Sequence, residues 1–230
     1  SGGVTKSHLR IAREEIERPY YVEKANTLVC TKDTYLLRYN ILDKIKNNGT
    51  FILVTDKAGR DLIKFLPNKV KRIIIDKNVD FYTIDAFDIA MRHNIPNKVS
   101  MIMEAAIFKV GKLVDYDLII NKIREQIRKK FSKKGSDVVD CNLDAIEEVS
   151  SKLIKVDINM TSLTEEKDYE NHLIKDEVMN LVSNLEGDKL PVSSFEKHMD
   201  GSFDPATSKL EKWDIANMLP CWDKEKCIQC

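Results

Sequence analysis

Short, largely apolar runs alternate with helical patterns over the first 110 residues, and this alternation limits the fold more than any other feature of the chain. Three such runs lie at 27–30, 51–54 and 81–84, and we read a further run, at 72–75, as a fourth strand. Continuous apolar runs are typical of strands that are covered on both faces of a parallel sheet. The sequence therefore predicts an α/β fold with a mostly parallel sheet flanked by helices, followed by a helical segment and an extended C-terminal tail.

Helices are expected between and after these runs. Leu37, Ile41 and Ile45 repeat every four residues, which predicts a helix that begins at an Asp33 cap and ends at the Asn-Asn-Gly of 47–49. Asp85 follows the run at 81–84, where we expect it to cap a helix rather than to act as an acid. Further helices are predicted at 62–66, 85–91, 101–110, 116–131, 138–156 and 173–185, and the one at 116–131 has a single apolar face.

The charges of the chain balance in total but not locally. Lysine plus arginine and aspartate plus glutamate number 37 each, which argues against a nucleic-acid partner. No apolar run approaches 18 residues, so a membrane is not expected as a partner either. Residues 122–134 nevertheless carry seven basic side chains against one acidic side chain. Two readings stay open: a solvated helix face, or an anion site at the turn that holds Lys133 and Lys134.

Five cysteines are unevenly placed, with Cys30 and Cys141 isolated and Cys221, Cys227 and Cys230 in the last ten residues. This is not the pattern of a secreted disulfide scaffold, so we expect a cytoplasmic protein. Cys30 fits a buried core thiol better than a nucleophile. Cys227 and Cys230 have C-x-x-C spacing, which fits a redox pair, half of a zinc site or the start of an iron–sulfur motif. Because metal sites normally need four ligands, either the motif is completed elsewhere in the protein or the chain is cut inside it.

Residues 2–10 combine glycines, hydroxyl groups and cationic side chains. Glycine lets a backbone approach a ligand closely, and an arginine such as Arg10 can bind phosphate or carboxylate through two hydrogen bonds. The same composition is also common in an ordinary terminal segment. No P-loop, zinc-protease, nucleophile-elbow or dinucleotide glycine motif is present.

Six segments, in order along nearly the whole chain, resemble the pyruvate:ferredoxin (flavodoxin) oxidoreductases, also called pyruvate synthases. Residues 2–10 resemble their G-G-V-T-x-S-H-L-R segment, and residues 227–230 match the C-I-Q-C that opens their ferredoxin-like domain. The other four segments are 48–53 (N-G-T-F-I-L), 101–109 (M-I-M-E-A-A-I-F-K), 132–135 (S-K-K-G) and 187–195 (G-D-K-L-P-V-S-S-F). One departure is E-K-W at 211–213, where the family has E-K-R.

The resemblance implies that the chain is a piece of a longer enzyme. Residues 1–186 are then the gamma-type α/β catalytic domain, 187–220 an extended linker, and 221–230 the truncated start of the ferredoxin-like domain. The parent is expected to be a homodimer that oxidatively decarboxylates pyruvate to acetyl-CoA and CO2. It uses thiamine diphosphate, Mg²⁺ and [4Fe–4S] clusters, and passes electrons to ferredoxin or flavodoxin. The fragment is expected to be inactive and to hold no cofactor, with the other domains of the chain as its partners.

The resemblance also implies site residues. The gamma domain covers the thiamine site and helps to bind coenzyme A, and we expect the contacts to come from Gly3, Val4, Thr5, Ser7, His8, Arg10, Lys133 and Lys134. Cys227 and Cys230 are expected to ligate a cluster in the intact chain, and no residue is assigned to catalysis. Two alternatives remain: a stand-alone protein-interaction module, and a thiamine-independent transferase that binds coenzyme A.

Overall fold

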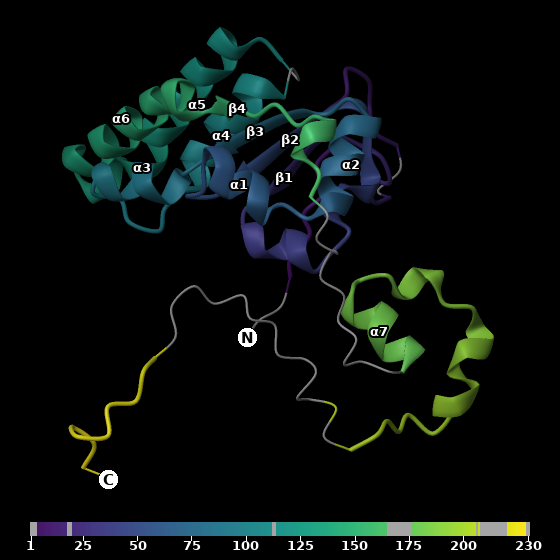
Figure 1. The fold of residues 1–230 in the computed structure, drawn as a ribbon. Helices are drawn as coiled ribbons and strands as arrows, with labels where there is room; N and C mark the ends of the chain where they lie inside the picture. The colour runs from purple at the N-terminus through teal and green to yellow at the C-terminus, as the bar shows by residue number, and fades with distance from the viewer. Residues whose placement is uncertain are drawn as a thin grey trace. The chain divides into compact units, whose positions relative to one another are not determined.

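The computed structural model describes residues 4–17, 20–111, 114–164, 176–205, 207 and 220–228. It divides the chain into two compact units (Figure 1). The larger unit is formed by residues 7–170, and the smaller unit combines residues 1–6 with residues 171–230. Each unit is described by itself below.

A four-stranded sheet forms the centre of the larger unit. Its strands lie in the order β1 (Ala25–Cys30), β2 (Ile45–Val54), β3 (Asp80–Ile84) and β4 (Ile154–Lys155). The first three strands are parallel, and β4 pairs antiparallel with β3. The α/β fold and the strands predicted at 27–30, 51–54 and 81–84 are therefore confirmed.

A hydrophobic core lies on each face of this sheet, and β2 contributes to both because successive side chains of a strand point to opposite sides. Phe51 and Leu53 of β2 enter one hydrophobic core, whereas Ile52 and Val54 enter the other. The first core is covered by η1 (Asp33–Leu37), η2 (Ile41–Lys44), α1 (Gly59–Phe65) and α2 (Asn68–Asp76).

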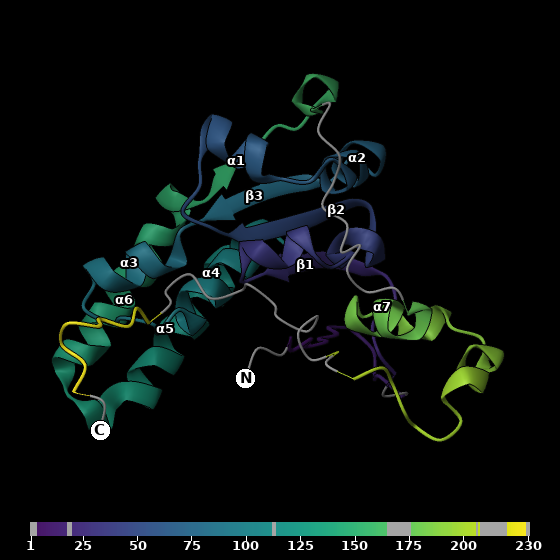
Figure 2. The same ribbon diagram turned by 60° about the horizontal axis from the view of Figure 1, so that its bottom comes forward.

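Four helices pack on the other face and gather at one side of the sheet (Figures 1 and 2). They are α3 (Ala86–Arg92), α4 (Ser100–Val110), α5 (Tyr116–Phe131) and α6 (Ser136–Lys152). The apolar stripe predicted for α5 is confirmed, since Ile120, Ile123, Ile127 and Phe131 are all buried. Asp85 caps α3 as predicted, because its Oδ1 accepts the Asp88 backbone N–H at 2.9 Å.

The run at 72–75 is part of helix α2, so the prediction of a strand there is wrong. Val70 and Ile74, four residues apart, are both buried in the core beneath the helix. Side chains four residues apart lie on the same face of a helix. Pro67 is the residue just before the first helical residue, a position where the fixed φ of proline is tolerated. A short apolar run fits a strand and a buried helix equally well, and here the packing decided between them.

The helix predicted from Asp33 to residue 47 is also wrong. Two short 3₁₀ helices, η1 and η2, occupy its first part, and β2 already begins at Ile45. Asn48, with φ of 55°, and Gly49 lie inside β2, where the pairing with β1 is irregular. A Cβ on Gly49 would lie 2.8 Å from Ile45 Cγ1 and 2.9 Å from the Lys46 oxygen, so only glycine fits this close approach. Gly49 therefore allows the irregular pairing of β2 with β1 and does not end a helix.

The smaller unit contains α7 (Glu177–Ser183), η5 (Gly187–Lys189) and η6 (Val192–His198). Asp176 caps α7 by accepting the Met179 backbone N–H at 2.8 Å. The helix predicted at 173–185 is confirmed over α7, and residues 173–175 lie outside the described residues. The predicted division of the chain at residues 186 and 220 stays a prediction.

Candidate functional site

The carboxyl ends of β1 and β2 bring a buried carboxylate against a lysine. Parallel strands end at the same edge of a sheet, so the residues that follow each strand become neighbours. Asp33, just after β1, accepts hydrogen bonds from Thr55 Oγ1 at 2.9 Å and from Lys57 Nζ at 2.8 Å. The Asp33 side chain is 9% exposed, and its hydrogen bond raises the pKa of Lys57. Asp33 is therefore a buried ion-pair partner and not the helix cap that its sequence position predicts.

A pocket of about 190 Å³ opens beside this pair at the same edge of the sheet. Its walls come from the segment after β2, the junction of β3 with α3, and the end of α6. Open α/β sheets characteristically bind ligands at this edge. The pocket is lined by Thr55, Asp56, Lys57, Ala58, Thr83, Ile84, Asp85, Asp88, Arg92, Lys152 and Ile154. The lining contains both carboxylates and cations, so it favours the binding of neither an anion nor a cation.

Glu148 of α6 joins the cations on this side of the unit. It accepts hydrogen bonds from Arg92 and, at 2.8 Å, from His93 Nε2, and it lies 3.8 Å from Lys152 Nζ. Partial burial works against the charged form of Glu148, but the hydrogen bonds of Arg92 and His93 outweigh it and lower the pKa of Glu148. This carboxylate ties α3 to α6, which is a structural role.

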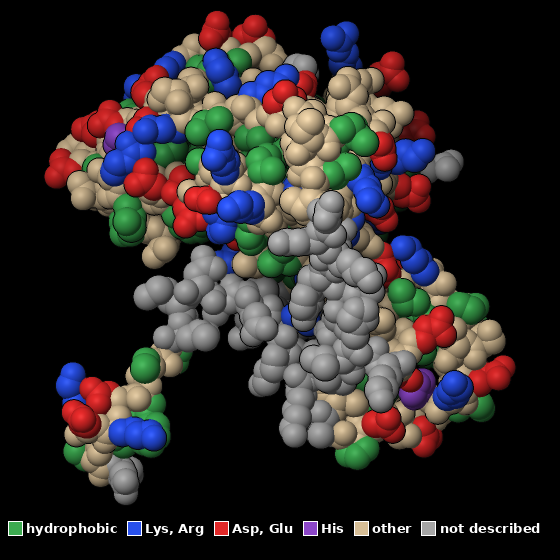
Figure 3. Space-filling view, viewed as in Figure 1, with side chains coloured by type: hydrophobic (Ala, Val, Ile, Leu, Met, Phe, Trp, Pro, Cys, Tyr) green, Lys and Arg blue, Asp and Glu red, His purple; other side chains and the backbone are tan. Residues whose placement is uncertain are grey.

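The α5–α6 corner differs from that edge because its cations have no acidic partner among the residues that the structure describes. We use this name for Arg128, Lys129, Lys130, Lys133 and Lys134, all of which are exposed. Within the described part of the chain, none of the five forms an ion pair, whereas Lys122 and Arg124 earlier in α5 pair with Glu125 and Glu147. On the face in Figure 3, basic and acidic side chains otherwise lie interspersed over the larger unit.

The backbone at this corner also offers positive partial charge. Lys133 and Lys134 form the 3₁₀ turn η3 (Ser132–Lys134), and Gly135 follows with φ of 104°. Gly135 stands at the N-cap of α6 and supplies no side-chain hydrogen bond to the first turn. The first N–H groups of a helix attract anions, so two lysines and a helix N-terminus converge here. Chemically, this arrangement suits a phosphate group.

The predicted N-terminal site residues are divided between the two units. Val4 and Thr5 belong to the smaller unit and Ser7, His8 and Arg10 to the larger, while Gly3 lies outside the described residues. In the described part of the larger unit, no hydrogen bond or ion pair joins Ser7, His8 or Arg10 to the α5–α6 corner. The structure thus brings Lys133 and Lys134 together and leaves the grouping of the other predicted residues with them untested.

His8 and Arg10 contact a nearby segment of the chain. His8 Nδ1 accepts the Val22 backbone N–H at 3.1 Å, and Arg10 Nη2 donates to the Tyr21 oxygen at 2.9 Å. The Arg10 guanidinium also lies 3.6 Å from the centroid of the Tyr20 ring, a cation–π contact. These contacts hold the two halves of residues 7–22 together, and they were not foreseen from the sequence.

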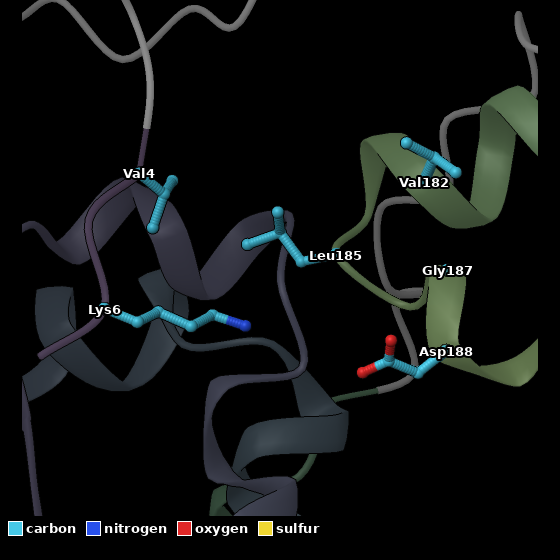
Figure 4. A pocket seen from close by; sticks show the side chains of 6 residues that line it. All are labelled: Val4, Lys6, Val182, Leu185, Gly187 and Asp188. Atoms are coloured by element: carbon cyan, nitrogen blue, oxygen red, sulfur yellow. The ribbon is translucent and has the colours of Figure 1, made fainter. Parts of the chain in front are cut away.

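A second hollow, of about 370 Å³, lies within the smaller unit. Its lining consists of Val4, Lys6, Val182, Leu185, Gly187 and Asp188 (Figure 4). Lys6 and Asp188 reach toward the hollow from opposite sides, and Leu185 lies between them. The hollow therefore lies between residues 4–6 and residues 182–188, two stretches far apart in the sequence. Reading each stretch separately gave no signal for Lys6, Val182 or Leu185.

The cysteines have contrasting surroundings. Cys30 is 3% exposed and donates to the Lys32 oxygen, and burial raises its pKa to about 12. A thiol with that pKa is not ionised near neutrality, which confirms the core role predicted for Cys30. Cys227 is exposed, and Cys230 lies outside the described residues. Among the residues that the structure describes, no three His, Cys, Asp or Glu side chains come together in a way that could hold a metal ion, and no helix is long and apolar enough to cross a membrane.

Comparison with known proteins gives matches along the entire chain. The family model described as pyruvate ferredoxin/flavodoxin oxidoreductase matches residues 1–151, and a model described as a domain of unknown function, EKR, matches residues 166–216. The pyruvate:ferredoxin oxidoreductase of Moorella thermoacetica is 35% identical over 240 residues, and the pyruvate-flavodoxin oxidoreductase of Klebsiella pneumoniae is 33% identical over 235 residues. Each match covers 100% of this chain and 20% of the relative.

The solved structure of the pyruvate oxidoreductase subunit PORC from Thermotoga maritima also matches, with a TM-score of 0.45 and 22% identity over 58% of this chain and 66% of that chain. The family assignment rests on the sequence matches. The chain spans about a fifth of the length of the curated relatives that it matches. Because the first family model covers well over half of its 230 residues, this chain belongs to the pyruvate ferredoxin/flavodoxin oxidoreductase family.

Proposed function

We propose that this chain is one domain of a longer enzyme that oxidatively decarboxylates pyruvate to acetyl-CoA and CO2 in the cytoplasm. The observation that carries the proposal is the match of the whole chain to relatives named pyruvate:ferredoxin and pyruvate-flavodoxin oxidoreductases. Since the chain spans only 20% of their length, most of the reaction's machinery belongs to other parts of the parent. The domain covers the thiamine site and is inactive alone.

Within that enzyme, the domain helps to bind coenzyme A through its phosphate groups. The α5–α6 corner supports this role, because Lys133 and Lys134 are exposed next to the N-terminus of α6 and form no ion pair with a described residue. Lysine ammonium groups and helix N–H groups are standard partners of phosphate. The remaining contacts are assigned to Gly3, Val4, Thr5, Ser7, His8 and Arg10. For His8 and Arg10, coenzyme A must either bind alongside their contacts with residues 20–22 or replace those contacts.

The other cofactors are assigned mainly to the rest of the parent, a homodimer that passes electrons to ferredoxin or flavodoxin. Thiamine diphosphate and Mg²⁺ are held by other domains. Cys227 and Cys230 have the spacing of iron–sulfur ligands. Because Cys227 is exposed, its thiol is accessible to a cluster whose other ligands come from elsewhere in the parent. A bound cluster supplies one-electron transfer, and this chain's part is to donate two of the thiolates.

The coenzyme A assignment is tested by the salt dependence of the Michaelis constant in the longer enzyme. Contacts between exposed lysines and phosphate weaken as salt rises, so the KM for coenzyme A should increase with ionic strength. The variant carrying Lys133→Ala and Lys134→Ala should show a higher KM and a smaller salt dependence. Lys122→Ala is the matched control, because it removes one charge from the preceding helix, α5, at a lysine that is paired with Glu125. A KM and salt dependence equal to those of the unmodified enzyme would reject the assignment.

A further inference from the structure

The side chain of His198 has a hydrogen-bond acceptor at each of its two ring nitrogens. His198 is the last residue of η6, and its Nδ1 lies 2.9 Å from the Ser202 backbone oxygen. Its Nε2 lies 2.9 Å from Asp176 Oδ2, at the start of α7. The imidazole is 12% exposed and stacks on the Phe203 ring, with 4.2 Å between the ring centroids. One side chain thus connects η6, the turn after it and the cap of α7.

These neighbours require a doubly protonated ring. A neutral imidazole has one N–H donor, but a carbonyl oxygen and a carboxylate are both acceptors. Asp176 cannot readily supply the missing proton, because its other oxygen accepts the Met179 N–H and stabilises the carboxylate form. That backbone hydrogen bond lowers the pKa of Asp176, with a smaller contribution from His198. Only the imidazolium form of His198 satisfies both acceptors at once.

Two carboxylates near the ring act in the same direction. Asp200 lies in the turn between His198 and Ser202, where its Oδ1 accepts the Ser202 N–H at 3.0 Å. Glu196 and Lys197 lie on η6 itself and are exposed. Glu186, just before η5, and Lys189, at the end of η5, form an ion pair of 2.9 Å with each other. Asp176 and Asp200 are therefore the carboxylates that favour the positive charge of the ring.

We propose that His198 is a proton-operated clasp that fastens η6 and the turn at 199–203 to the N-terminus of α7. With two ring protons, the clasp is closed and both acceptors are bonded. With one ring proton, either the Ser202 oxygen or the Asp176 carboxylate loses its donor. The segment 192–203 then loosens from α7.

The direction of the pH dependence follows from the same contacts. The hydrogen bond to Ser202, and after it the one to Asp176, raise the pKa of His198 above its usual 6.5 despite opposing burial. A group whose pKa is raised by folding stabilises the fold fully below its unfolded pKa. This contribution is lost as the pH rises through the folded pKa. The clasp is thus closed in mildly acidic solution and opens as the solution becomes alkaline.

Histidine and amide hydrogen exchange, both read by mass spectrometry in the intact enzyme, test the proposal. Exchange at the imidazole C2–H should show that His198 titrates above 6.5. Amide protection of residues 192–203 should fall between about pH 6 and about pH 8.5, after correction for intrinsic exchange rates. Asp176→Asn, which keeps a good N-cap for α7, should lower the His198 pKa and reduce the change in protection. His93→Asn, in the larger unit, is the control and should leave the protection of 192–203 unchanged.

Two results would overturn the clasp: a His198 pKa at or below 6.5, or equal protection of residues 192–203 at both pH values. Both are measured on the unsubstituted enzyme, so they decide the matter even if a variant fails to fold. Loss of the pH-dependent protection in His198→Asn, with the rest of the protein unchanged, would support it.

Discussion

The two charged regions of the larger unit contain similar residue types but use them in opposite ways. At the carboxyl edge of the sheet, Lys57 pairs with buried Asp33, and Arg92 pairs with Asp88 and Glu148. At the α5–α6 corner, five cations are exposed, and none pairs with a described carboxylate. A charge that forms an ion pair within the protein stabilises the fold, whereas a charge without such a partner can bind a ligand. This difference fits a stabilising role for the first region and the anion-binding role that we propose for the second.

The largest effect is expected from Asp33→Ala. This change leaves Lys57 without its main acidic partner and removes the acceptor of Thr55 Oγ1. Breaking a buried ion pair costs about 3–5 kcal/mol, and the partial exposure of Lys57 reduces this to about 2–3 kcal/mol of unfolding free energy. Chemical denaturation measures the loss. Asp56→Ala, at a carboxylate whose side chain is 78% exposed, should change the unfolding free energy by no more than about 0.5 kcal/mol. Equal losses of unfolding free energy in the two variants would contradict the stabilising role of the buried Asp33 carboxylate.

The Lys133→Ala, Lys134→Ala variant should show the opposite pattern. We expect the KM for coenzyme A to rise about tenfold, equivalent to about 1.4 kcal/mol. The unfolding free energy should stay within about 0.5 kcal/mol, because neither lysine forms an ion pair with a described residue. Steady-state kinetics and denaturation on the same preparation measure both quantities. A clear loss of stability would show that these lysines belong to the fold.

Glu148→Gln should lower the unfolding free energy by about 1 kcal/mol near neutral pH, because it weakens charged hydrogen bonds with Arg92 and His93. The pKa of Glu148 is lowered by folding from 4.5. Its stabilisation is therefore present above 4.5 and disappears as the pH falls through the folded pKa. The difference between the two proteins should shrink accordingly in denaturation experiments across acidic pH. A difference that grows on acidification would contradict the ionised state of Glu148.

Lys122→Ala should have the smallest effect. Lys122 and Glu125 form an exposed pair one helical turn apart, with 3.2 Å between Nζ and Oε2. Such pairs contribute about 0.2–0.5 kcal/mol, so the thermal midpoint should hardly move. The KM for coenzyme A should stay within about twofold of the original value. A KM increase as large as that of the Lys133 and Lys134 variant would show that the basic face of α5 also attracts the ligand, and not the α5–α6 corner alone.

The sequence predicted the elements whose pattern is locally decisive. The apolar stripe of α5 spans 16 residues, long enough for its period to be unambiguous, and the run at 51–54 had the composition of a strand buried on both faces. The run at 72–75 was too short for its period to separate a strand from a helix, and packing against the sheet made it helical. At Gly49, strand pairing overrode a local pattern that favours a helix end.

The candidate sites were predictable to different degrees. Lys133 and Lys134 are adjacent and follow a basic run, so their clustering is visible in the sequence. Asp33 and Lys57 are 24 residues apart and meet only because β1 and β2 are parallel neighbours. The hollow of the smaller unit likewise requires residues 4–6 and 182–188 to come together in space. Contacts of this kind depend on tertiary structure, which local spacing does not reveal.

The most direct test of the account measures stability and coenzyme A affinity for both regions in the longer enzyme. The Asp33→Ala variant should lose unfolding free energy while its folded fraction keeps the original KM for coenzyme A. The Lys133→Ala, Lys134→Ala variant should keep its stability and show the higher KM. If the KM of the lysine variant is unchanged while its stability falls, the exposed cations of the α5–α6 corner are not a ligand site, and the central claim is wrong.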